Sequence, residues 1–130
     1  MIEMREVLQR QIAALWEAAR SFGADETGHQ LLAGLVETIA EAEAQLAGLR
    51  LHLLHEARLS GADGVAAGVR QSVRTTSGQA AASLKLSFDL GERFPLVGAA
   101  LQEGTVSLAQ AEGIVSGLRK LPARLSRAEL

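Results

Sequence analysis

Three histidines are the residues of this sequence best suited to metal or acid–base chemistry. His52 and His55 stand three apart with Glu56 beside them, so one helical face could offer two imidazoles and a carboxylate. His29 is remote from this group, and the chain contains no cysteine and no asparagine. Because no third or fourth ligand follows, we interpret the pair as a solvated flank of a leucine-rich helix. We expect no metal site, no cofactor, no catalytic residue and no small-molecule substrate.

A second group of polar residues could contact nucleic acid. Residues 65–91 have the pattern of a helix–turn–helix, in which the helix after Thr76 would approach the major groove. The first turn of that helix would face phosphates or base edges, and arginines on the preceding helix and turn would hold phosphates. The candidate contacts to double-stranded DNA are Arg70, Arg74, Ser77, Gln79 and Lys85.

The helix after Thr76 also carries an argument against DNA contact. Its pattern predicts a buried face of Ala80, Ala81, Leu84 and Phe88. The outward stripe is then Lys85, Asp89, Glu92 and Arg93. Such a stripe is nearly neutral, and its acids would repel backbone phosphates. A purely structural helical hairpin therefore remains the alternative. A diffuse positive C-terminal edge could be added to the DNA contacts by Arg119, Lys120, Arg124 and Arg127, or these residues could simply form a solvated face.

Composition places these residues on helices. The chain has 130 residues, 48% of them hydrophobic, with two prolines and 3% aromatic residues, which favours an all-α domain. The formal net charge is −2, so no global basic field indicates nucleic acid. We find no apolar run of membrane-spanning length and no signal peptide, and we expect a cytoplasmic protein without a membrane partner.

Residues 1–60 are predicted to form a long antiparallel helical hairpin. The first helix ends at Phe22-Gly23, and a capping box of Thr27 and Gln30 begins the second, which runs to Ser60-Gly61. Its apolar residues follow a coiled-coil rhythm. That rhythm fits either packing within the chain or a homodimer through this helix. The stripe consists of Leu32, Leu35, Ile39, Ala42, Leu46, Leu49 and Leu53.

Residues 61–122 are predicted to form a cluster of short helices with helix–turn–helix geometry. A short helix spans 65–73, and the next begins at a capping box of Thr76 and Gln79 and runs to about Gly91. Pro95 opens a third helix that ends near Gly104. The fourth begins at a capping box of Ser107 and Gln110 and fades by Leu121-Pro122; residues 123–130 then hold the start of a truncated helix. We expect 1–130 to be a single helical domain.

Several short runs in this second half carry a family resemblance. They are Val65-Ala66-Ala67-Gly68-Val69, Thr76-Ser77-Gly78-Gln79-Ala80, Pro95, Ala99-Ala100-Leu101, Glu103-Gly104, Val106-Ser107, Gln110-Ala111 and Ile114-Val115. The pattern resembles the actinobacterial domain of unknown function found N-terminal to HNH endonuclease domains, and most of residues 28–122 is covered. Gly68 stands where that family has tryptophan, and 76–79 stand where it has a Ser-Arg-Arg-Glu turn.

The resemblance implies a longer protein with a C-terminal HNH nuclease. We therefore expect a non-catalytic N-terminal module that positions or dimerises the nuclease on DNA. The alternative is a self-association or partner-binding helical module with no direct DNA contact.

Overall fold

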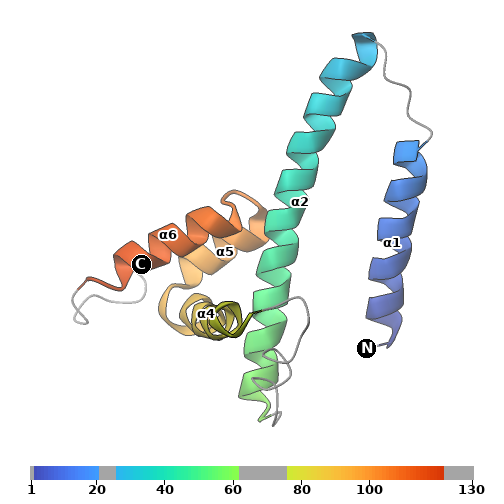
Figure 1. Ribbon diagram of the computed structural model, residues 1–130. Helices are drawn as coiled ribbons and strands as arrows, with labels where there is room; N and C mark the ends of the chain where they lie inside the picture. The colour runs from blue at the N-terminus through green and yellow to red at the C-terminus, as the bar shows by residue number, and fades with distance from the viewer. Residues whose placement is uncertain (1, 21–25, 62–75, 122–130) are drawn as a thin grey trace. The chain divides into compact units, whose positions relative to one another are not determined.

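The computed structural model describes residues 2–20, 26–61 and 76–121, and every regular element in these ranges is helical (Figure 1). This confirms the all-α prediction. The elements are α1 (Ile2–Arg20), α2 (Glu26–Leu59), α4 (Ser77–Phe88), the π-helical segment η1 (Asp89–Arg93), α5 (Pro95–Glu103) and α6 (Leu108–Leu118). The chain divides into two compact units, residues 1–36 and residues 37–130. The predictions of one domain and of a hairpin over 1–60 stay predictions.

The first unit contains α1 and the first turns of α2. On α1, Arg10 pairs with Glu6 one turn earlier over 3.7 Å, and both side chains are exposed. Pairs of this kind support a helix only weakly, by about 0.3–0.5 kcal/mol. The capping box predicted at Thr27 is wrong in its position, because α2 already begins at Glu26 and Thr27 lies inside the helix.

The other end of α2 lies where the sequence predicts it. The helix ends at Leu59, and the Ser60 hydroxyl donates to the carbonyl of Ala57 over 2.8 Å. Gly61 follows with a φ of 72°, the left-handed conformation that glycine adopts without strain. The short helix predicted over 65–73 and the truncated helix predicted over 123–130 lie outside the described residues.

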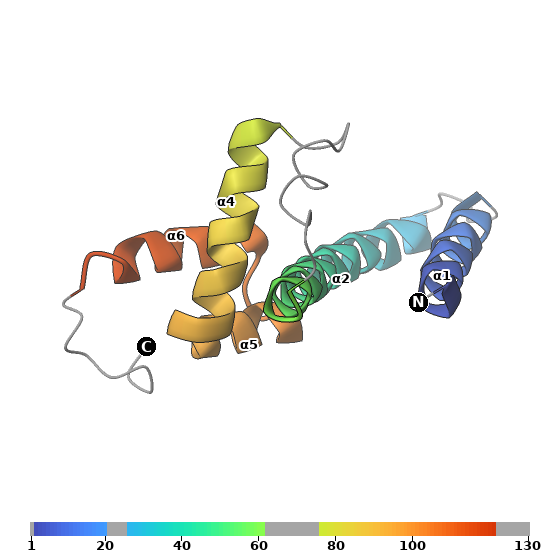
Figure 2. The ribbon, with the colours of Figure 1, turned by 90° about the horizontal axis from the view of Figure 1, so that it is seen from below.

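The core of the second unit forms where α4, η1, α5 and α6 gather on one side of the C-terminal half of α2 (Figures 1 and 2). The buried residues come from all of these elements: Ala44, Leu51, Leu86, Leu90, Phe94, Val97, Leu101, Ala111 and Val115. Gly48 allows α2 and α5 to approach closely, since a β-carbon there would stand 3.0 Å from the backbone of Gln102. The apolar end of α2 is thus covered in part by the second half of the chain.

Two capping boxes, a proline and a glycine determine where α4 and α6 begin and where α5 begins and ends. The Thr76–Gln79 and Ser107–Gln110 capping boxes are both formed, with reciprocal bonds of 2.8–3.1 Å, as predicted. Pro95 opens α5, and Gly104 closes it with a φ of 79°. These caps set the starting points of α4 and α6, the two helices that matter most for the site.

The buried face predicted for α4 is wrong at Ala81 and Phe88. Ala80 and Leu84 are buried, but Ala81 is exposed and Phe88 is 45% exposed, whereas Asp89 is only 2% exposed. Buried residues cover more of the surface of α4 and η1 than one stripe, because these segments contact both α2, through Arg58, and the end of α6, through Arg119.

The segment η1 also departs from the α-helix expected up to Gly91. The Phe94 amide donates to the carbonyl of Asp89 over 2.6 Å, one residue further than in an α-helix. Phe94 leaves the helical region, with a φ of −128°, because the residue before a proline avoids that region. Pro95 thus ends the α4–η1 run and turns the chain into α5.

Candidate nucleic-acid interface

An open groove of ≈ 700 Å³ lies in the second unit, with walls from α2, α4 and α6. Two of the predicted DNA-contact residues, Gln79 and Lys85, lie in it. The lining consists of Arg50, Leu51, Gln79, Ala82, Ser83, Lys85, Leu86, Leu108, Glu112 and Arg119. Leu51 and Leu86 are almost fully buried, whereas Arg50, Gln79, Lys85 and Glu112 are exposed.

The other predicted contact residues are not brought to this groove by the described structure. Ser77 is the first residue of α4, and its side chain lies outside what the structure describes. Arg70 and Arg74 fall outside the described residues. Gln79 has a structural task as well, because its side-chain oxygen accepts the Thr76 amide in the capping box over 3.0 Å. Its side-chain NH₂ group remains a donor for another molecule.

The charged residues of the groove are mainly cationic. Arg50 from α2 and Lys85 from α4 are both exposed, and neither has an ion-pair partner among the described residues. Arg119, at the C-terminal end of α6, adds a third cation, against one acid, Glu112, among the described residues of the lining. Positive charge is therefore concentrated in this groove on a chain whose formal net charge is −2.

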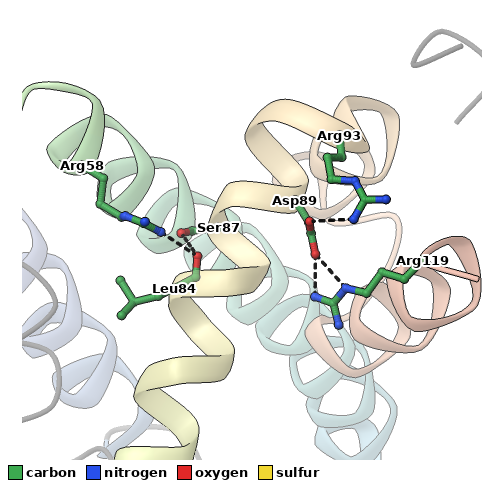
Figure 3. Close-up of polar contacts among 6 residues, drawn as sticks. All are labelled: Arg58, Leu84, Ser87, Asp89, Arg93 and Arg119. Atoms are coloured by element: carbon green, nitrogen blue, oxygen red, sulfur yellow. Dashed lines mark hydrogen bonds and ion pairs between the residues drawn. The ribbon is translucent and has the colours of Figure 1, made fainter. Parts of the chain in front are cut away.

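Arg119 is held in place by a buried carboxylate (Figure 3). Its Nε donates to Oδ2 of Asp89 over 2.8 Å, and its Nη2 forms an ion pair with the same oxygen over 2.6 Å. Arg93 approaches the other oxygen at 3.7 Å. The predicted outward position of Asp89 is wrong: the carboxylate faces inward because two arginines compensate the cost of burying it. One of the acids expected to repel DNA is therefore neutralised within the protein.

A second polar contact fixes α4 against α2. The carbonyl of Leu84 accepts hydrogen bonds from Arg58 Nη1 over 3.3 Å and from the Ser87 hydroxyl over 2.8 Å (Figure 3). Lys85 is the next residue along α4, so this contact also fixes the position of its backbone at the groove.

One histidine, His55, forms a structural contact outside the lining of the groove. His55 is 7% exposed, and its Nε2 lies 2.9 Å from Oε1 of Glu92. A carboxylate only accepts, so Nε2 carries the hydrogen. His52 is exposed, as predicted for a solvated flank, but for His55 that prediction is wrong. No cluster of three potential metal ligands occurs in residues 2–20, 26–61 and 76–121.

Sequence reasoning missed Arg50 and the roles of Arg119 and Asp89. Arg50 stands between two leucines of the heptad helix, where nothing in the pattern marks it as a binding residue. Arg119 and Asp89 are 30 residues apart, and only the packing of α6 beside η1 brings them together. Pro95 was a usable sequence signal for the change near Asp89. The residue before a proline avoids the helical region, so the preceding helix is expected to lose its α-helical geometry before Pro95.

The helices and the groove define the second unit as an all-α module with a mainly cationic groove. The family model for a domain of unknown function (DUF222) matches residues 33–130, and the chain belongs to this family. The match begins inside α2 and includes every residue that lines the groove. Comparisons with curated proteins and with solved structures gave no match. Among the described residues, no helix combines the length and the apolar character that crossing a membrane requires.

Proposed function

We propose that this chain is a non-catalytic cytoplasmic module that binds double-stranded DNA and thereby positions an HNH-type nuclease domain. The observation that carries the proposal is the groove between α2, α4 and α6. Gln79 and Lys85 line this groove together with two further cationic side chains, Arg50 and Arg119. Phosphate contacts provide most of the affinity of a protein for DNA, and they require cations gathered on one surface. Clefts lined by charges of one sign also concentrate the electrostatic field.

The test is a titration of a fluorescently labelled DNA duplex with the 130-residue chain over a series of salt concentrations. We expect binding at low salt, with the logarithm of the association constant falling linearly with the logarithm of the salt concentration. Absence of binding at the lowest salt concentration would refute the proposal.

Self-association is the second candidate, and a separate observation favours it. Ile39, Leu46 and Leu53 repeat every seven residues along α2 and are 55%, 45% and 44% exposed. A heptad repeat of this kind fits a second copy of the same helix. Light scattering over a range of concentrations tests this candidate: a dimer would dissociate on dilution, and a monomer at every concentration excludes it.

A further inference from the structure

We infer that the groove binds the sugar–phosphate backbone of duplex DNA, with Arg50, Lys85 and Arg119 as the phosphate contacts. The inference rests on the proposed function and says which residues perform it. It also replaces the predicted mode of contact, in which the first turn of α4 would enter the major groove. Arg50 and Arg119 have no place in that predicted mode.

The shape of the surface favours the backbone over the major groove. A recognition helix has to protrude from its protein in order to reach base edges. One side of α4, from Gln79 to Leu86, instead forms a wall of a concave groove. A concave cationic surface fits the convex, anionic ridge of a DNA strand. Side chains reaching from this groove would meet phosphates before bases.

Arg50 and Lys85 are available for this contact. Both side chains are exposed, and neither has an ion-pair partner among the residues that the structure describes. They project from different helices, α2 and α4, so the cations flank the groove rather than forming a row on one helix. A phosphodiester strand in the groove would meet both without breaking an existing contact.

Arg119 contributes a charge whose orientation is already fixed. A guanidinium has five N–H donors in a planar fork, and Arg119 turns its Nε and Nη2 edge toward Asp89. The end of the fork, formed by Nη1 and the second Nη2 hydrogen, remains for a phosphate, which a guanidinium binds through two parallel bonds. Arg93 shares the carboxylate at 3.7 Å, so the three charged groups together keep one net positive charge.

Variants that remove the charge but keep a polar side chain test the inference by DNA titration over a range of salt. We expect Arg50→Gln with Lys85→Gln to reduce the salt slope by about 2, because each lost phosphate contact lowers it by about 1. The matched control is Arg5→Gln with Arg10→Gln on α1, which removes the same charge outside the groove and should leave the slope at the wild-type value.

Arg119 needs a variant that keeps the fold, because its complete removal would leave the Asp89 carboxylate buried without its closest partner. Arg119→Lys retains a cation for Asp89 but loses the free end of the fork, so we expect the slope to fall by about 1. Thermal unfolding of the variant checks that the fold is intact. Two duplexes of unrelated sequence should bind equally, since phosphate contacts carry no sequence information.

The outcomes separate this inference from the proposed function. If Arg50→Gln with Lys85→Gln keeps the wild-type affinity and slope while the wild type binds DNA, the groove is not the site, although the module still binds DNA. A strong preference for one of the two duplexes would also overturn backbone recognition. If the wild type binds no duplex at low salt, both the inference and the proposed function are wrong.

Discussion

Two nitrogens of Arg119 contact one and the same oxygen of Asp89: Nε donates a hydrogen bond over 2.8 Å, and Nη2 forms an ion pair over 2.6 Å. That carboxylate is 2% exposed. The contact joins the end of α6 to the segment that follows α4, 30 residues earlier in the chain. Two walls of the cationic groove are thereby fixed to each other. The stability of the module and the shape of its candidate site depend on the same pair.

Replacing Asp89 with asparagine should destabilise the chain. The variant keeps the size of the side chain but loses the charge that two arginines share, which we expect to cost about 2 kcal/mol of unfolding free energy. Urea unfolding followed by circular dichroism measures the change. The control is Glu112→Gln, which removes an exposed acid with no ion-pair partner among the described residues and should leave the unfolding midpoint unchanged. Equal midpoints for Asp89→Asn and the wild type would contradict this role for the pair.

Gly91 should not tolerate a side chain. A β-carbon at this position would stand 2.7 Å from Nε2 of His55, which is too close for two atoms that are not bonded. Because His55 is buried and bonded to Glu92, we expect Gly91→Ala to cost about 1–3 kcal/mol.

The matched variant for Gly91 is Gly113→Ala on α6, where a β-carbon meets nothing within 4 Å. It should stabilise the chain by about 0.5–1 kcal/mol, since alanine favours the helix over glycine. Thermal unfolding measures both variants. If both substitutions changed the unfolding temperature in the same direction, the contact with His55 would not be what excludes a side chain at position 91.

The capping boxes should contribute measurably to stability. Thr76→Ala and Ser107→Ala each remove the oxygen that accepts the amide three residues later, over 3.1 Å in both boxes. Each should cost about 1 kcal/mol. Thr76→Ser keeps the accepting oxygen and should behave like the wild type in the same chemical denaturation experiment. A loss in Thr76→Ser as large as that in Thr76→Ala would mean that the threonine methyl group, not the cap, provides the stability.

Removing the acid of the groove should strengthen DNA binding. Glu112 is the one acid among the described residues that line the groove, and its negative charge would repel a bound phosphate. We expect Glu112→Gln to bind a duplex about twofold to fivefold more tightly at low salt, with the gain shrinking as salt screens the interaction. The same fluorescence titration measures it. Unchanged or weaker binding would place the DNA away from α6.

The starts of α4, α5 and α6 and the end of α5 could be predicted because local residues determine them. Thr76, Ser107, Pro95 and Gly104 act within one turn of their own positions, so a single sequence contains all the necessary information. The position of Asp89 could not be predicted in the same way. It depends on partners on two sides of α4 and on an arginine that tertiary packing brings in from α6.

The residues of the candidate site differ in the same way: some could be predicted from the sequence and others could not. Lys85 and Gln79 were identified because they share a helix with a recognisable cap. Arg50 was not, because it enters the groove only when α2 packs against α4 and α6. A periodic pattern describes one helix at a time, whereas a groove between three helices is a property of their packing.

Backbone amide NMR of the isotope-labelled 130-residue chain during addition of a DNA duplex tests the central claim most directly. The account predicts that the largest shift changes fall on the residues around Arg50, along α4 and at the end of α6 near Arg119. Changes confined to α1 or to the heptad leucines of α2, or spectra that do not change on addition of DNA, would contradict it.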